Sequence, residues 1–189
     1  MDQRWLDLVD TRANWPSRNP VERLRDTDLL ARWLHDHGLS TELAPTASDL
    51  AMVRQVRSAL RELAVGRIHE RTPHPQALDT VNAALARAAK APRHVVVPDP
   101  IEPGHLRRQL ADVDAALALI IEQAIDTLAG SDARHLRECE ESSCGALFLD
   151  YTGRRRWCST PACGIRARVR AHRARQRYEV PAGPAGRYV

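Results

Sequence analysis

The chain has 189 residues and a formal net charge of +4, from 28 basic and 24 acidic side chains. It contains no run of about 18 apolar residues, so the sequence predicts no membrane-spanning helix. The first ten residues, MDQRWLDLVD, lack the basic start and apolar core of a signal peptide, so we expect a cytoplasmic protein whose thiols stay reduced.

The first predicted elements are short. Residues 1 to 15 alternate apolar and polar side chains, and this pattern fits either a strand or a helix. Asp26 or Thr27 can cap a following helix that stops at Gly38.

Longer elements follow up to residue 130. Ser48 is a suitable N-cap for a helix that runs to about Leu63, and Pro73 and Pro75 precede a third helix over residues 77 to 90. The valines at 95 to 97 predict a short strand, and a long helix is expected from about His105 to Ala129, ended by Gly130.

These elements predict an α+β, mainly helical fold in three parts. A helical domain with a little strand is expected over residues 1–130, with a role in dimerisation or effector sensing. A zinc module built from a β-hairpin and a basic helix is expected over 131–180, followed by a flexible tail over 181–189. The first part is long enough to bury a core, whereas the second is near the size at which a domain needs a staple.

No catalytic constellation stands out in the helical part, so we expect no enzyme. Six histidines lie singly, and each is better explained as a surface or packed side chain than as a base or ligand. Trp5, Trp15 and Trp33 could line a ligand pocket, but tryptophans in helical domains usually belong to the core.

All four cysteines fall in two similar stretches, CEESSCG and CSTPACG, with the spacing Cys139-x4-Cys144-x13-Cys158-x4-Cys163. Four thiolates delivered by two tight turns suit one tetrahedral structural zinc, and they leave no open position for a hydrolytic water. The glycine after the second cysteine of each pair permits a positive φ. Two disulfides, four buried free cysteines, or replacement of one ligand by His135 or His172 are the alternatives.

Between the cysteine pairs, Phe148 and Trp157 flank a segment from Asp150 to Gly153 that reads as a turn between two short strands. With Tyr151 these aromatics are expected to form the small core of the module. Stacking on bases is the alternative.

Basic charge gathers in the same region. Residues 151 to 177 hold nine arginines and no acidic residue, which leaves a net −5 for the rest of the chain. Residues 164 to 178 read as a helix with Arg166, Arg170, Arg173 and Arg177 on one side and Arg168 and Arg175 on the other. Such a stripe repels itself unless a polyanion neutralises it, although a solvated surface is the alternative. We therefore expect contacts with nucleic acid from Arg154, Arg155, Arg156, Arg166, Arg168, Arg170, Arg173 and Arg177.

The stretch LRECEESSCGALFLDYTGRRRWCSTPACGIR with the following helix resembles the CGNR zinc finger family, and LDLVDTRANW with DTDLLARWLHDHGL resembles the ABATE domain that usually precedes this finger. The resemblance implies a treble-clef-like finger with Cys139, Cys144, Cys158 and Cys163 as zinc ligands. It also implies an actinobacterial, stress-linked transcription regulator. Ile165 stands where the signature has Asn, and Asp10 stands where the ABATE family commonly has Asn.

The leading hypothesis is a zinc-finger regulator that binds double-stranded DNA in the nucleoid, as a homodimer, with or without a small-molecule effector. An RNA-binding module is the second hypothesis. A ligand-binding or protein-interaction protein, in which the zinc finger only docks a partner, is the third.

Overall fold

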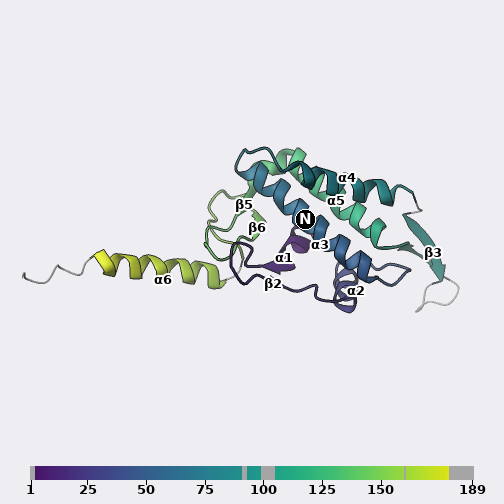
Figure 1. Ribbon diagram of the computed structural model, residues 1–189, viewed down its shortest axis with the longest axis horizontal. Helices are drawn as coiled ribbons and strands as arrows, with labels where there is room; N and C mark the ends of the chain where they lie inside the picture. The colour runs from purple at the N-terminus through teal and green to yellow at the C-terminus, as the bar shows by residue number, and fades with distance from the viewer. Residues whose placement is uncertain (1–2, 91–92, 99–104, 160, 179–189) are drawn as a thin grey trace, which may run out of the picture.

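The computed structural model describes residues 3–90, 93–98, 105–159 and 161–178, without the side chains at 107, 108, 177 and 178 (Figure 1). The tail expected over 181–189 lies outside the described residues. A helical body occupies the centre, a hairpin extends from one end, and the helix α6 (Pro161–Tyr178) projects from the other. None of the described helices is long and apolar enough to cross a bilayer. The mainly helical α+β fold predicted from the sequence is confirmed.

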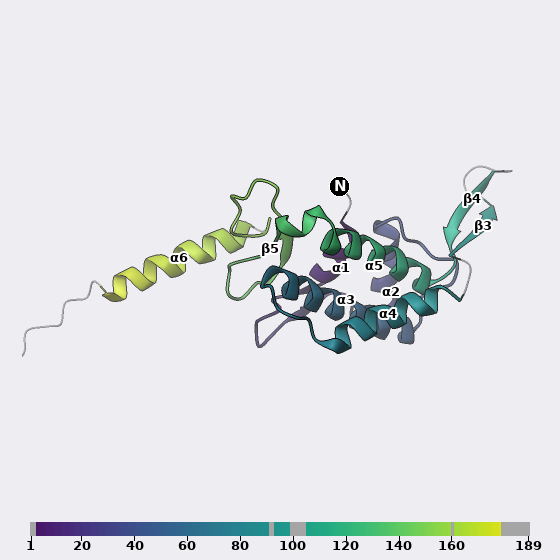
Figure 2. The same cartoon turned by 90° about the horizontal axis from the view of Figure 1, so that it is seen from above.

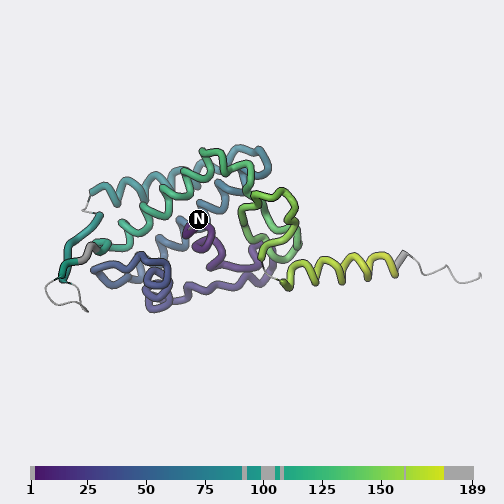
Figure 3. Tube along the Cα trace, turned by 180° about the vertical axis from the view of Figure 1, so that it is seen from behind, coloured from purple at the N-terminus to yellow at the C-terminus, as the bar shows by residue number. Residues whose placement is uncertain are grey.

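Four helices form the body: α1 (Arg4–Asp10), α3 (Ala47–Ile68), α4 (Pro75–Ala88) and α5 (Val113–Ala129). Figure 3 shows α3, α4 and α5 running side by side, and α1 packs against α3 and α5. The structure thus settles the first segment as a helix. Trp5 belongs to the core, as expected, and is fully buried, and its indole N–H donates to the Thr127 hydroxyl at 3.2 Å. Apolar side chains of α3 and α5 face inward, with Val56, Leu60 and Ile121 completely covered.

The helix ends show how local side chains set the boundaries. In α2 (Thr27–Asp36), the Asp26 carboxylate accepts from the backbone N–H of Leu29, and Gly38 follows the helix with φ +66°, so both predicted ends are confirmed. The Ser48 N-cap is wrong. Thr46 caps α3 instead, because its hydroxyl accepts from the Asp49 N–H while the Asp49 carboxylate accepts from the Thr46 N–H at 2.8 Å.

The long helix expected from His105 begins eight residues later. Residues Leu106–Leu110 form strand β4, which pairs antiparallel with β3 (His94–Pro98), and the Asp112 carboxylate caps α5 by accepting from the Ala115 N–H at 2.9 Å. The strand at 95–97 is therefore confirmed, and its partner is part of the segment that was expected to be helical. Figure 2 shows this hairpin at the end of the body away from α6.

Two smaller hairpins complete the fold. Strands β1 (Arg12–Ala13) and β2 (Val21–Glu22) pair near the end of α1, and β5 (Leu136–Glu138) pairs with β6 (Leu147–Leu149) after a 3-10 turn over Ser131–His135. The second hairpin carries the first cysteine pair in its loop. The zinc module therefore starts with strand β5, which packs directly against α3.

Candidate metal centre and basic helix

The four cysteines come from three different local structures. Cys139 and Cys144 lie in the loop of the β5–β6 hairpin, Cys158 follows an extended loop, and Cys163 sits in the first turn of α6. Gly145 has φ +64°, as the sequence suggested, and lets the chain turn back after Cys144. Gly164 does not adopt a positive φ. It belongs to α6, where a side chain would meet the Trp157 ring at about 3.5 Å.

The sulfur atoms fit one tetrahedral metal ion. All four Sγ atoms lie within 4.8 Å of one another, and Cys158 Sγ is 3.8 Å from Cys144 Sγ and 3.6 Å from Cys163 Sγ. Zinc–sulfur bonds of about 2.3 Å place tetrahedral sulfurs about 3.8 Å apart, which is close to these two distances. None of the four forms a disulfide. One structural zinc therefore fits this site, as predicted.

The surroundings of the sulfurs suit thiolates held by a cation. Burial raises the pKa of the Cys144 and Cys163 thiols, so a divalent ion must displace their protons as it binds. The Cys158 N–H points at Cys139 Sγ at 3.4 Å, and the Arg166 guanidinium lies 3.3 Å from Cys163 Sγ. Such donors stabilise sulfur charge and orient the ligands.

Neither histidine named as an alternative ligand joins the cluster of described ligand atoms. His135 Nε2 faces the Arg134 guanidinium at 3.1 Å, and the His135 ring packs on Tyr151 with centroids 4.8 Å apart. His172 is exposed on α6. The structure therefore brings together four sulfurs and no imidazole at this centre.

The segment from Asp150 to Gly153 is a turn, but it does not join two strands. The partner of β6 is β5, which precedes it, and no strand follows the turn in the described part of the module. The buried Asp150 carboxylate instead closes the loop, accepting from the Thr152 hydroxyl at 2.6 Å and from the Arg155 N–H at 2.8 Å. These hydrogen bonds, that of Thr152 foremost, hold the pKa of Asp150 down at about 2.

The aromatic side chains divide between core and surface. Phe148 is buried among the cysteines, and Trp157 packs half-buried against the same cluster, which agrees with the small core expected there. Tyr151 was expected in the same core, but it is exposed, and its hydroxyl donates to Asp132 at 3.1 Å. Of these three aromatic side chains, Tyr151 is the one most open to solvent, with His135 packed against its ring.

The module is fixed to the helical body through one side of its first cysteine loop. The Trp15 N–H donates to the carbonyl of Cys144 at 3.2 Å, and Arg61 of α3 donates to Glu138 at 2.5 Å and to the Gly145 carbonyl at 3.1 Å. A side chain at Gly145 would lie 2.7 Å from Pro16. Backbone groups next to a zinc ligand thus depend on residues more than 80 positions away, which sequence patterns do not reveal.

The arginines expected to contact nucleic acid are not equivalent in the structure. Arg155 lies over the Phe148 ring at 4.5 Å, and Arg156 pairs with Glu140 at 2.6 Å. Arg154, Arg168 and Arg173 are exposed. Arg177 belongs to α6, but its side chain lies outside the described residues.

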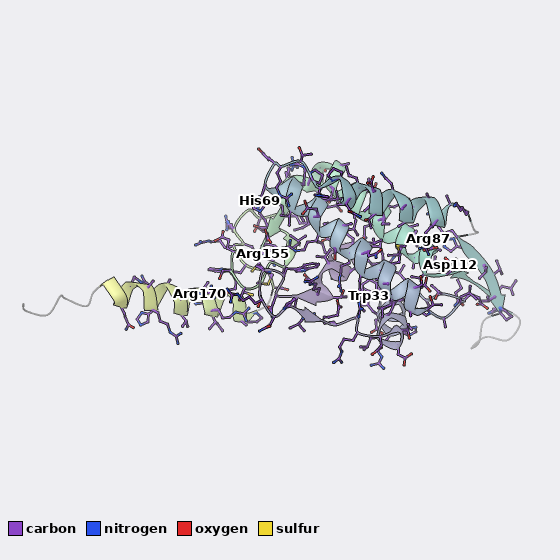
Figure 4. The ribbon with its side chains drawn as sticks, viewed as in Figure 1. Trp33, His69, Arg87, Asp112, Arg155 and Arg170 are labelled. Carbon is purple, nitrogen blue, oxygen red and sulfur yellow. The ribbon has the colours of Figure 1, made fainter. Side chains whose placement is uncertain are left out.

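A buried acidic residue in the first cysteine loop contacts two more of these arginines, and the sequence did not predict this contact. Glu141 is 1 % exposed, its carboxylate bonds Arg170, and the Arg166 guanidinium lies 4.0 Å from it. Arg170 also donates to the Ser142 hydroxyl. Figure 4 shows Arg170 in the half of α6 nearest the module. In the sequence, the only local sign of this contact was an acidic residue two positions after the first cysteine.

Comparison with known families gives two matches that together span nearly all of the described chain. The ABATE family, described as "Putative stress-induced transcription regulator", matches residues 2–131. The CGNR zinc finger matches residues 135–176, which include the four cysteines and most of α6. No curated protein matches the sequence.

Proposed function

The chain belongs to the ABATE family and carries a CGNR zinc finger, and from that premise we propose that it is a regulator that binds double-stranded DNA through α6 and the adjoining arginine loop. The proposal is for a binding protein and not an enzyme. The zinc holds the module together and has no catalytic part, because its four cysteine ligands leave no position for substrate.

One observation carries the proposal. Helix α6 projects from the body (Figure 1), and its described side chains include exposed arginines on more than one side and no wide apolar face that could belong to a core. A helix of 18 residues is about 27 Å long, and an isolated helix with stacked like charges is marginal in water. A groove lined by negative charge would neutralise the arginines and give the helix a surface to pack on. The major groove of B-DNA is wide enough to accept a helix.

Guanidinium groups suit this role better than generic positive charge. They bond phosphate oxygens and the guanine edge with two parallel donors, so they can both position the helix and read bases. Ile165 and Val169 are exposed on α6, and apolar contacts of this kind can meet the methyl group of thymine.

The test measures the affinity of zinc-loaded protein for pooled fragments of its own genome across a salt series. We expect some fragments to bind at about 10⁻⁸ M at physiological salt and random DNA to bind at least about 10³-fold more weakly. Six phosphate contacts would lower the affinity by roughly 10³ between 50 and 200 mM salt. The control is the same protein after chelation of zinc. Weak, uniform binding to every fragment would refute the proposal.

RNA binding is retained as a second candidate because of the exposed Tyr151 ring. It predicts a preference for single-stranded RNA over duplex DNA that is lost in Tyr151→Ala. Dimerisation and effector sensing by the helical body remain proposals, to be tested by the molar mass in solution with and without DNA.

A further inference from the structure

The arginines of α6 meet two kinds of surroundings. Cys163, Arg166 and Arg170 lie within about 60° of one another around the helix axis and face the zinc module. Arg168 and Arg175 lie on the far side, and Arg173 is about 15 Å along the helix from Cys163, beyond the module. In the part of the chain that the structure describes, no carboxylate pairs with these last three.

Glu141 explains the difference. A buried carboxylate is costly unless cations and donors surround it, and this one has Arg170, Arg166 and the hydroxyl of Ser143 at 3.0 Å. Each guanidinium is therefore partly compensated within the chain, and an outside phosphate gains less from Arg166 or Arg170 than from an arginine without a carboxylate beside it.

The loop that carries Glu141 is closed at both ends by the metal site. It lies between the ligands Cys139 and Cys144, and the Cys144 N–H donates to the Glu141 carbonyl at 2.8 Å. Apart from the contacts between cysteine sulfurs, the described hydrogen bonds and ion pairs from α6 side chains to the rest of the chain end on this loop. Arg166 and Arg170 therefore act as anchors that fix the direction in which α6 leaves the body.

We propose that Glu141 is a positioning residue that holds α6 through Arg170 and Arg166, and that Arg168, Arg173 and Arg175 make the phosphate contacts. The second half of this assignment rests on the proposed function, whereas the first half does not. It divides the arginines that the sequence treated as one set into an anchoring pair and a contacting group.

The first experiment needs no nucleic acid. Amide hydrogen exchange is followed over α6 in zinc-loaded wild type, Glu141→Gln and Glu140→Gln. Glu140 is the matched control because it lies in the same loop, is half-exposed and, among the described residues, pairs with Arg156 and not with an arginine of α6. We expect exchange in residues 166–172 to accelerate roughly tenfold or more in Glu141→Gln and to stay unchanged in Glu140→Gln. Arg170→Gln should reproduce the effect, and the double variant should add little to it. Equal exchange in Glu141→Gln and wild type, at equal zinc content, would overturn the anchor.

The second experiment compares salt slopes of DNA binding. We expect Arg173→Gln and Arg168→Gln each to lower the slope by about 0.9, the value for one lost phosphate contact. Arg170→Gln should leave the slope unchanged and reduce the preference for specific over random fragments, because the helix loses its direction. A slope that drops as far in Arg170→Gln as in Arg173→Gln overturns the division. If wild type fails to bind DNA, the exchange experiment still decides whether Glu141 is an anchor.

Discussion

Asp10 provides a quantitative test of how the helical body treats a buried charge. It stands at the end of α1, next to the cavity of about 430 Å³ between the β1–β2 hairpin and the zinc module. Burial raises the pKa of Asp10 from 3.8 to about 6, although Arg23 and Arg61 oppose this, and no hydrogen bond to its carboxylate is found among the described residues. The ABATE resemblance places an Asn at this position, so Asp10→Asn is the natural perturbation.

The sign follows from proton linkage. Between pH 3.8 and 6 the folded protein holds a proton on Asp10 that the unfolded chain has lost, so stability falls as the pH rises through this range. Above pH 6 both states are ionised and the folded one carries the full cost. At 1.36 kcal/mol per pH unit the cost is about 3 kcal/mol at pH 7 and about half of that at pH 5. Asp10→Asn should recover up to these amounts.

The assay is urea unfolding of zinc-loaded protein at pH 5, 6, 7 and 8, with the zinc content of wild type and variant measured at each pH and required to be equal. We expect Asp10→Asn to be more stable than wild type at pH 7, and the gain to shrink as the pH is lowered to 5. Asp36→Asn serves as the control, because Asp36 is exposed at the end of α2 and should change little. A gain that does not vary with pH, or a loss of stability at pH 7, would contradict the reasoning.

Three further outcomes are expected. Arg57→Met should destabilise the body by about 3 kcal/mol in urea unfolding, because Arg57 is 1 % exposed and makes two hydrogen bonds to Glu22 and one to Thr11. An effect below about 1 kcal/mol would show that the pair is dispensable. Gly145→Ala should weaken zinc retention against a chelator, since φ is +64° and the added carbon would lie 2.7 Å from Pro16. Gly153→Ala is the control, because it has the same backbone strain at φ +68° but open space around the added carbon. The carboxyl pKa of Glu62, held at about 2 mainly by its hydrogen bond with Arg71, should rise toward 4.5 in Arg71→Gln when titrated by NMR, and an unchanged value would remove Arg71 as the cause.

Several features could be predicted from short stretches of sequence, because each depends on neighbours within a few residues. The Asp26 cap and the Gly38 stop of α2 are of this kind, since a cap needs only an acceptor three residues before the N–H it satisfies. The zinc site is similar in nature. Two cysteine pairs in tight turns can meet only if the chain folds back on itself, and sulfur chemistry then selects the metal.

The errors arose where two readings of one segment were locally equivalent. Residues 106–110 suit a helix as well as a strand, and the structure pairs them with β3, which lies up to 16 positions earlier in the chain. The turn at Asp150 was recognised, but its position in the sheet was not, because strand pairing depends on which segments are near in space.

The sequence by itself determined the parts of the protein: a mainly helical body, one zinc held by four cysteines, and a helix rich in arginine. Only the tertiary structure decided which charges are already compensated. Glu141 and Arg170 are 29 residues apart, and Arg61 reaches Glu138 across 77. Pairs at such separations leave no periodic trace along the chain, and they form because a buried charge must find its partner wherever the fold places one.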